Sequence, residues 1–454
     1  MLSYIQFYNT IISQIGGKKN TKKYWDTLTH NGVMFPEEYK PINVPIIYDG
    51  KEILLNPEAE EAATFYAKYI KTEYVNNKRF SKNFWSDFSK LIDKDLNITD
   101  FEKIDFNLIR KHIEKENENR LNMTKEQKEA IKLEQKKKEE KFLFATIDGK
   151  EQPVGNFRIE PPGIFLGRGC HPLIGKIKKR VYPEDIIINI GKDEKVPDTG
   201  FENRSWKQVI HDKNVIWLAS WKENISNKTK YVFLSDKSDF KSESDLSKFE
   251  LARKLKKKAG EIKKVNDENL KDENEKTRQL ATVLYFIENL SLRVGNEKSQ
   301  DEADTVGVTS LRIEHIELLG NNVIKLDFLG KDSIRYTKKF EINPVVYQNL
   351  ELFSKDKGKK DELFHRINPS EINNYLQSFM KGLTSKVFRT MNASRLFQRE
   401  LNKITTKFEN YEKEDKLNLL LDEYMKANAK VAMLCNHQKN VNKNFKDMVD
   451  KFDD

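Results

Sequence analysis

Four short blocks of this sequence carry side chains that suit the chemistry of a phosphate group. They centre on Arg293, Lys331, Arg389 and His437 and span residues 292–298, 330–336, 388–394 and 434–438. Two guanidinium groups, an ammonium group and an imidazole can stabilise a phosphate whose negative charge rises in a transition state. The residues after His437 include no tyrosine, serine or cysteine, so we expect the nucleophile to come from elsewhere. The blocks therefore predict a pocket that holds and polarises a phosphate.

Two helices and a hairpin are expected to position these residues. An apolar stripe at helical spacing predicts a helix over 280–290, ending near Gly295, where glycine can take the left-handed cap. Alternating apolar residues at 324–328 predict a strand, and a return strand begins at 334, which places Lys331 at a hairpin tip. A further helix is predicted over 427–438. Residues 248–264 read as a helix rich in lysine and arginine.

The first half of the sequence mixes strands with helices. We expect a strand within 41–50 that runs into an Asp-Gly turn, and a helix that begins at Pro57. Residues 124–141 predict a solvated helix supported by i,i+4 charge pairs, with a DNA-facing helix as the alternative. Short apolar strands are predicted at 185–190, 215–221 and 231–234. The proline and glycine content of 158–172 predicts an ordered, irregular loop, which precedes a basic cluster at 176–180.

Composition favours a polyanionic partner. The chain of 454 residues has 81 Lys+Arg against 71 Asp+Glu, a formal charge of +10 and a pI near 9.0. Its two cysteines, Cys170 and Cys435, imply neither a disulfide framework nor a structural zinc site, so no metal is expected. There is no run long and apolar enough for a membrane span, and we expect a soluble, intracellular protein. The absence of a Walker loop and of GxGxxG predicts no nucleotide cofactor.

Several longer motifs point to one family. They are Thr27 to Pro36 (TLTHNGVMFP), Phe157 to Gly163 (FRIEPPG), Tyr182 to Asn189 (YPEDIIIN) and the four blocks above. In these residues, and in their order along almost the whole chain, the sequence resembles the eukaryotic type IB DNA topoisomerases. Two positions in the loop depart from the family pattern, because Leu166 stands where arginine is common and Cys170 where asparagine is common.

The resemblance implies a role for each pocket residue. Arg293 and Arg389 would hold the non-bridging oxygens of the scissile phosphate, with His437 assisting, and Lys331 would be the general acid for the departing 5′ oxygen. A tyrosine would attack the phosphate to form a 3′-phosphotyrosyl bond, and supercoils would relax without ATP or a metal ion. The tyrosines Tyr375, Tyr411 and Tyr424 do not lie in the family's Ser-Lys-x-x-Tyr setting.

The resemblance also implies contacts with duplex DNA. The residues that match family contact positions are Arg120, Arg168, Lys178, Trp217, Lys230, Tyr231, Lys248, Val294, Gly295, Asn296, Glu297, Lys298, Thr305, Asp332, Thr384, Ser385 and Lys386. Each residue taken alone has an ordinary explanation, such as a capping arginine, a turn lysine or a tryptophan in a core. The functional interpretation depends on their occurring together.

The resemblance further implies an α+β, two-lobed DNA clamp. One lobe would be mixed α/β, with 1–38 and 124–237 forming a first subdomain and 39–123 a cap. The other lobe, 238–454, would be mainly helical and similar to the catalytic domain of tyrosine recombinases. These expectations follow from the family and not from the spacing of residues.

Three explanations remain open for the missing tyrosine. A separate small subunit would supply it, as in the two-subunit enzymes of kinetoplastid protozoa, or the sequence is incomplete, or the protein binds duplex DNA without catalysis. The family function predicts a nuclear location, and 253–258 could serve as an import signal or belong to a solvated or DNA-facing helix.

Overall fold

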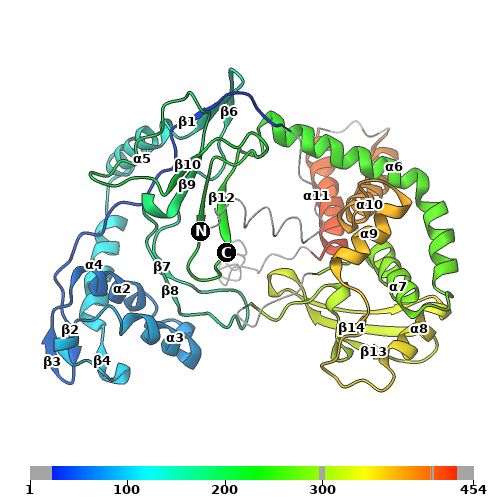
Figure 1. The fold of residues 1–454 in the computed structure, drawn as a ribbon, viewed down its shortest axis with the longest axis horizontal. Helices are drawn as coiled ribbons and strands as arrows, with labels where there is room; N and C mark the ends of the chain where they lie inside the picture. Colours follow the sequence, from blue (N-terminus) through cyan, green and yellow to red (C-terminus); the bar gives the residue numbers. More distant parts are fainter. Residues whose placement is uncertain (1–22, 296–301, 410, 412–413, 437–454) are drawn as a thin grey trace, which may run out of the picture. The chain divides into compact units, whose positions relative to one another are not determined.

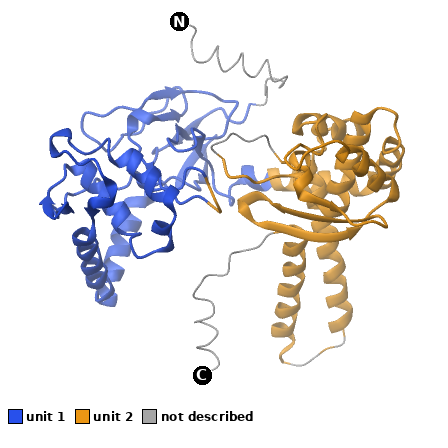
Figure 2. Cartoon of the chain, turned by 90° about the horizontal axis from the view of Figure 1, so that it is seen from below, with its two compact units in different colours: residues 1–167, 172–243 blue, residues 168–171, 244–454 orange. Residues whose placement is uncertain are grey.

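A computed structural model describes residues 23–295, 302–409, 411 and 414–436. The chain divides into two compact units, coloured separately in Figure 2. Unit 1 comprises residues 1–167 and 172–243, and unit 2 comprises 168–171 and 244–454. Both units combine helices with small sheets (Figure 1), which confirms the predicted α+β class. The division into three subdomains and the clamp stay predictions.

Unit 1 carries most of the short strands. Its strands are β1 (Leu28–His30), β2 (Ile46–Tyr48), β3 (Lys51–Ile53), β4 (Ile104–Asp105), β5 (Phe144–Ile147), β6 (Lys150–Pro153), β7 (Gly163–Ile164), β8 (Ile177–Lys178), β9 (Ile186–Asn189), β10 (Gln208–Ile210), β11 (Ala219–Lys222) and β12 (Thr229–Val232). Its helices are α2 (Pro57–Ala67), α3 (Lys78–Phe88), α4 (Asn107–Leu121) and α5 (Lys125–Glu140). The start of α6 (Asp239–Asn269) also belongs to this unit.

The sheets of unit 1 are small, and one of them is mixed. Strand β9 lies between β10, which is parallel to it, and β11, which is antiparallel, and β12 follows at the edge. Ile188 of β9 stands opposite Val209 on one side and Ala219 on the other. The other sheets have the orders β1-β5-β6, β3-β2-β4 and β7-β8.

Two separate hydrophobic clusters stabilise unit 1. The first surrounds Trp25 and packs β1, β5, β9 and β11 together. The second gathers α2, α3 and α4, and includes Phe80, Phe84 and Phe88 of α3 at full burial. These phenylalanines are four residues apart and therefore share one face of the helix. Burying each of them contributes about 1.5–3 kcal/mol to the stability of the folded state.

Unit 2 contains one three-stranded sheet and the longer helices. The strands are β13 (Ile316–Leu318), β14 (Val323–Leu329) and β15 (Arg335–Glu341), paired in that order and antiparallel. The helices are the rest of α6, then α7 (Glu275–Leu290), α8 (Pro344–Ser354), α9 (Pro369–Phe379), α10 (Ser385–Phe408) and α11 (Lys416–Leu434). Helix α7 packs against α8, α9 and α10, and α10 packs along α11.

One hydrophobic cluster joins the helices of unit 2 to its sheet. Strand β14 buries Ile324, Leu326 and Phe328 and leaves the residues between them partly exposed, because neighbouring strand residues point to opposite faces. The same cluster includes Phe286 of α7 and Phe388 of α10, both fully buried. This shared core fixes the end of α7, the start of α10 and the β14–β15 hairpin relative to one another.

The predicted elements are present, with shifted ends. The strand expected within 41–50 is only Ile46–Tyr48, and the strand expected from 215 begins at Ala219. The helix expected over 124–141 is α5, capped by Thr124 and almost wholly exposed. Helix α11 begins before residue 427 and ends at Leu434, while 437 and 438 lie outside the described residues. No helix of the described ranges is long and apolar enough to cross a membrane.

Candidate active site

The C-terminal end of α7 forms one wall of the site. The helix ends at Leu290, and the next residue, Ser291, takes the left-handed conformation with φ of 54°. Ser291 is therefore the helix cap, and the expectation that Gly295 would cap it was wrong. Ser291 is buried, and tertiary hydrogen bonds hold it in this conformation. Asn392 donates from Nδ2 to Ser291 Oγ at 2.9 Å and to the carbonyl of Glu288 at 2.6 Å.

Arg389 of α10 connects two helix ends. Its Nη1 donates to the carbonyl of Ser291, after α7, and its Nη2 donates to the carbonyl of Cys435, after α11, at 3.1 Å. Carbonyls at helix C-termini lack intrahelical partners and carry the negative end of the helix dipole, so they attract a cation. Arginine has five N–H donors, and these two bonds leave three available for another acceptor.

Arg293 lies three residues after α7, in a segment fixed through its backbone. The amide of Val308 donates to the carbonyl of Arg293 at 2.8 Å, and the amide of Thr309 donates to the carbonyl of Val294 at 2.9 Å. At this crossing Gly307 meets Gly295 so closely that a Cβ on Gly307 would lie 2.2 Å from the Gly295 nitrogen. Only glycine fits at residue 307 without displacing the segment that carries Arg293.

The β14–β15 hairpin presents Lys331 at its tip, as the sequence predicted. The amide of Gly330 donates to the carbonyl of Ile334 at 2.8 Å, and a short 3-10 turn, Lys331–Ser333, closes the hairpin. Asp332 and Ser333 have φ of 67° and 58°, which is uncommon for residues other than glycine. The tip is supported by residue 168, since Arg168 forms an ion pair with Asp332 and its carbonyl accepts a bond from Ser333 Oγ at 3.2 Å.

These elements enclose a cavity of about 190 Å³ in unit 2. Its charged lining residues are Arg293, Lys331, Asp332 and Arg389, and Asn436 and Cys435 complete one side. Three of the four predicted pocket residues therefore line one cavity, although 96 residues separate the two arginines in sequence. The fourth, His437, lies outside the described residues, directly after Asn436.

The cavity has an excess of positive charge. Burial, and then the charge of Arg293, lower the pKa of the Arg389 guanidinium, which shows that the two cations repel one another. No carboxylate of the described residues forms an ion pair with Arg389, and the one carboxylate in the lining, Asp332, is paired with Arg168. An anion held between the arginines would relieve this repulsion.

Tyr336 is the one tyrosine among the described residues that line the cavity, and it is not placed as a nucleophile. Its side chain is buried, at 4% exposure, and its ring stacks on Phe328 with centroids 5.1 Å apart. Burial raises the pKa of its hydroxyl to about 12, so the phenolate that attacks readily is disfavoured.

The other predicted DNA-contact residues of unit 2 lie on separate elements. Thr384 precedes α10, and Ser385 and Lys386 begin it, so their backbone amides lie at the positive end of the helix. Lys248 is exposed on α6 and pairs with Asp245 at 3.4 Å, and Thr305 is buried near Arg312 and its partner Asp304. Val294 and Gly295 follow Arg293, while Asn296, Glu297 and Lys298 lie outside the described residues.

In unit 1 several predicted contact residues gather beside β11 and β12. Trp217 packs against Tyr231 at 5.7 Å, and Lys230 is the neighbouring residue of β12. Lys178 of β8 donates to Glu160 at 2.5 Å, and both lysines lower the pKa of that carboxyl group. Arg120 is exposed in the last turn of α4, apart from this group.

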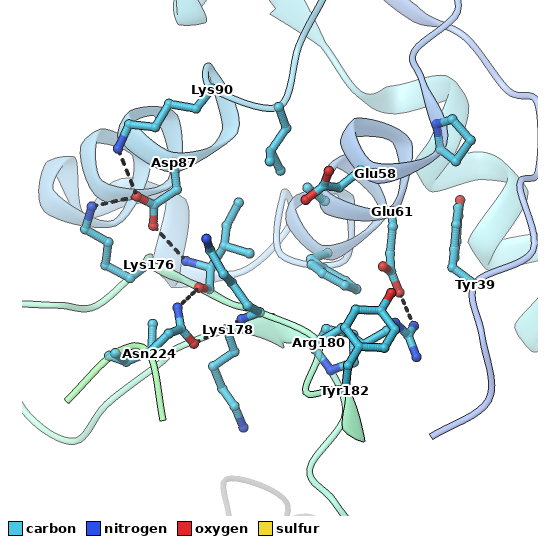
Figure 3. Close-up of a pocket in the computed structure, with 18 of the residues that line it drawn as sticks. Tyr39, Glu58, Glu61, Asp87, Lys90, Lys176, Lys178, Arg180, Tyr182 and Asn224 are labelled. Atoms are coloured by element: carbon cyan, nitrogen blue, oxygen red, sulfur yellow. Dashed lines mark hydrogen bonds and ion pairs between the residues drawn. The ribbon is translucent and has the colours of Figure 1, made fainter. Parts of the chain in front are cut away.

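A larger cavity of about 850 Å³ lies in unit 1 (Figure 3). Its cations are mostly neutralised: Asp87 binds Lys176 at 2.8 Å, and Arg180 binds Glu61 at 2.6 Å. Figure 3 shows both pairs on the cavity wall, with Asn224 holding the backbone of β8. Because carboxylates accompany these cations, this cavity is less suited to a phosphate than the smaller one, where no carboxylate of the described residues pairs with Arg389 and the charge of Arg293 acts on it.

Comparison with known proteins places these observations in a family. The model of the DNA-binding fragment of eukaryotic DNA topoisomerase I matches residues 23–234, and the model of its catalytic core matches 237–454. The chain belongs to the eukaryotic DNA topoisomerase I family. The structure adds to this assignment that the core region holds the arginine-lined cavity.

Individual relatives agree with the family models. The chain is 45% identical over 437 residues to DNA topoisomerase 1 of Candidozyma auris, which covers 95% of this chain and 57% of that protein. It is 44% identical to the human DNA topoisomerase 1, over 93% of this chain and 55% of the human protein. It is 43% identical to DNA topoisomerase 1 beta of Arabidopsis thaliana, over 95% of this chain and 46% of that protein. The chain thus spans about half the length of these relatives.

The described residues contain no group of three or more His, Cys, Asp or Glu side chains that could hold a metal ion. The sequence did not assign roles to Ser291 or to Asn392, which together hold the end of α7 beside Arg389. The position of Ser291 directly after the apolar stripe could have indicated a helix cap. The residues around Asn392 do not indicate that its partner, Ser291, lies 101 residues away.

Proposed function

We propose that this chain holds duplex DNA and polarises one phosphodiester for ATP-independent, type IB strand cleavage and religation, which relaxes supercoils. The observation that supports the proposal is one cavity whose lining includes Arg293, Lys331 and Arg389, where the charge of Arg293 lowers the pKa of the Arg389 guanidinium. A phosphodiester there would offset the repulsion between the two guanidinium groups. As its charge rises in the transition state, the same guanidinium groups would bind it more strongly.

The proposed reaction is a transesterification. A tyrosine oxygen attacks phosphorus, the bond from phosphorus to the 5′ oxygen breaks, and the 5′ oxygen takes a proton from the Lys331 ammonium group. The 3′-phosphotyrosyl ester keeps the energy of the phosphodiester, so the reverse attack by the 5′ hydroxyl reseals the strand. His437, outside the described residues, would donate to a non-bridging oxygen as the family resemblance implies.

The tyrosine is proposed to lie outside these 454 residues. The candidate inside the cavity, Tyr336, is buried and stacked. Each relative compared above is a single chain that is longer than this sequence, which supports a continuation of the chain as the source of the tyrosine and gives no support to the separate small subunit that the sequence suggested.

The proposal is tested with supercoiled plasmid in the presence of EDTA and without ATP. The chain alone is expected to bind duplex DNA in a salt-sensitive manner without relaxing it. Addition of a polypeptide that carries Ser-Lys-x-x-Tyr is expected to give relaxation and a covalent protein–3′-phosphate adduct. Salt-sensitive binding with no relaxation and no adduct, for any such polypeptide, would support a DNA-binding protein without catalysis instead.

Lys331→Ala tests the assignment of the general acid. Binding of duplex is expected to be unchanged, while cleavage slows by about 10²–10⁴-fold because the leaving oxygen loses its proton donor. A DNA strand with a 5′-bridging phosphorothiolate is the matched control, since its sulfur leaves without protonation and the variant should cleave it at nearly the wild-type rate. Equal slowing on both substrates would contradict the role.

A nuclear location follows from the proposed function. The basic run 253–258 lies within α6, where Leu255 is fully buried, so we propose that it acts as part of the folded helix and not as an extended import signal. A fluorescent fusion with Lys256, Lys257 and Lys258 changed to Gln should still accumulate in nuclei. Loss of nuclear signal in that variant would assign the run to import.

A further inference from the structure

A second positively charged hollow lies in unit 2, in an open groove of about 710 Å³ between α6 and α10. Five of its lining residues are cations: Lys256 of α6, and Arg395, Arg399, Lys403 and Lys407 of α10. The remaining lining residues are polar and uncharged, and none is acidic or apolar. None of the groove residues lines the cavity that contains Arg293 and Arg389.

The four cations of α10 are evenly spaced. They occur at every fourth residue, which corresponds to steps of about 6 Å and a run of about 18 Å along the helix. A single nucleic-acid strand presents a phosphate about every 3.4 Å along the duplex axis, so a backbone lying along the groove would place several phosphates within reach. The groove therefore presents a row of charges that suits a regular polyanion.

A buried carboxylate organises this row without neutralising it. Glu400 lies on the same helix with 7% of its side chain exposed, and it binds Lys403 at 3.0 Å and Lys430 at 2.6 Å, with Arg399 at 3.6 Å. The bonds from Lys430 and Lys403 lower the pKa of Glu400 to about 2, so it stays ionised at neutral pH. One carboxylate thus pairs with three cations, and the side chains of Arg399 and Lys403 remain largely exposed.

The other cations of the groove are compensated to different degrees. Lys407 shares Glu423 with Lys426, at 3.1 and 3.3 Å, and Lys426 also pairs with Asp422 at 2.7 Å, so Lys407 is largely neutralised. No carboxylate in the described part of the chain lies within ion-pairing distance of Lys256 or Arg395. The groove also lacks the apolar pockets in which protein partners usually bury their anchoring side chains. Charge and polarity therefore favour a nucleic-acid backbone over an acidic protein segment.

We propose that the α6–α10 groove binds the phosphate backbone of nucleic acid at a site separate from the arginine-lined cavity. The contacts are to phosphates and not to bases, because the lining offers point charges along a line and no element that enters a groove of the duplex. The bound backbone belongs either to the same duplex further along or to a second molecule. The inference does not depend on whether the cavity cleaves DNA.

The test compares two variants that lose the same charge. In one, Arg395, Arg399 and Lys403 are changed to Gln, and in the control Lys355, Lys359 and Lys360, which are exposed in the same unit, are changed to Gln. Binding of a labelled long duplex is measured by anisotropy between about 50 and 200 mM salt. The slope of log K against log salt is negative, and in the groove variant its magnitude is expected to fall by about 2–3, because each lost phosphate contact removes about 0.9. The control should leave the slope nearly unchanged.

Two further arms identify the bound species. If the groove binds a second DNA molecule, titration with a short duplex should saturate at two duplexes per protein in the wild type and at one duplex per protein in the groove variant. One equivalent in both proteins, with a slope change seen only for the long duplex, assigns the site to the same duplex. If the groove variant instead loses binding of polyglutamate and keeps its slope on DNA, the proposal is overturned in favour of an acidic protein partner.

Folding and charge type are controlled separately. The thermal midpoint of the control variant should match the wild type, because its substituted side chains are exposed. The groove variant should melt somewhat lower, because the buried Glu400 keeps only Lys430 as its partner, and its DNA binding is therefore measured well below that midpoint. A second groove variant, Lys256→Gln with Lys407→Gln, should reduce the slope by about 1–2, and Arg395→Lys with Arg399→Lys should restore it, since phosphate contacts need only a positive charge. An unchanged slope in both groove variants refutes the proposal, whatever the plasmid-relaxation assay gives.

Discussion

Arg180 in unit 1 and Arg389 in unit 2 are both poorly exposed arginines that donate to backbone carbonyls, but their charges are treated differently. Arg180 donates to the carbonyl of Glu37 at 2.8 Å and binds the carboxylate of Glu61 at 2.6 Å, with side-chain exposures of 12% and 16%. Arg389 donates to two helix-end carbonyls and has Arg293 as its charged neighbour. The first is a neutralised ion pair, and the second is the cation that we propose binds an anion.

Under the proposed function, this difference distinguishes a structural arginine from one that binds a ligand. A half-buried guanidinium group such as that of Arg389 is stable when a carboxylate accompanies it, so placing it beside a second cation, the exposed Arg293, adds an unfavourable repulsion. Such repulsion is retained where a bound anion removes it. Cavity size alone would favour the region of Arg180, whereas charge compensation favours that of Arg389.

The largest expected effect is on cleavage. With a tyrosine-bearing polypeptide present, Arg389→Met should slow adduct formation by about 10²–10³-fold, because a donor to the transition-state oxygens is lost. Arg180→Met should leave the rate of the folded protein nearly unchanged. Single-turnover cleavage of a labelled duplex measures both, and similar rates for the two variants would remove the distinction drawn between these arginines.

The next effect is on folding stability, and it concerns the Arg180 ion pair of unit 1 rather than Arg389. Glu61→Gln leaves the Arg180 charge without its carboxylate, which should lower the free energy of unfolding of unit 1 by about 3 kcal/mol. Glu58→Gln, an exposed position on the same helix and the same cavity wall, should change it by less than about 0.5 kcal/mol. Denaturant unfolding measures both, and equal values would show that the ion pair is not structural.

A third prediction concerns the backbone crossing beside Arg293. Gly307→Ala would force a Cβ to within 2.2 Å of the Gly295 nitrogen, so it should destabilise unit 2 by about 1–3 kcal/mol and slow cleavage. Gly260→Ala, in α6 with nothing within 4 Å of the added carbon, should stabilise the same unit by about 0.5–1 kcal/mol. Thermal unfolding gives the sign for each variant, and a neutral Gly307→Ala would show that the crossing can yield.

The smallest effect is stabilisation by a simple anion. Sulfate at about ten times its dissociation constant should stabilise the folded protein by about 1.4 kcal/mol through binding between the arginines. The rise in thermal midpoint should be smaller in Arg389→Met than in the wild type or in Arg180→Met. The difference between variants isolates the cavity from the general effect of sulfate on proteins, and identical rises in all three would place sulfate elsewhere.

Local patterns predicted the elements of the site but not the contacts between them. Alternation in β14 and the Gly-Lys turn were enough to place Lys331 at a hairpin tip, and the apolar stripe was enough to find α7. The bonds of Arg389 to the carbonyls of Ser291 and Cys435 span 98 and 46 residues, and no neighbouring residue indicates them. The cap at Ser291 was missed because its left-handed conformation depends on the tertiary contact with Asn392, whereas sequence patterns favour glycine.

The backbone crossing of Gly295 and Gly307 also helps to set the distance between Arg293 and Lys331. Residues 306–308 bond on one side to the carbonyl of Arg293, through Val308, and on the other to the carbonyl of Leu329, through Val306, two residues before Lys331. The spacing between the arginine that would hold the phosphate and the lysine that would release its leaving oxygen is therefore set by peptide groups. Because these bonds join peptide groups, substitutions of the side chains of Val306 and Val308 are expected to leave the spacing between Arg293 and Lys331 unchanged.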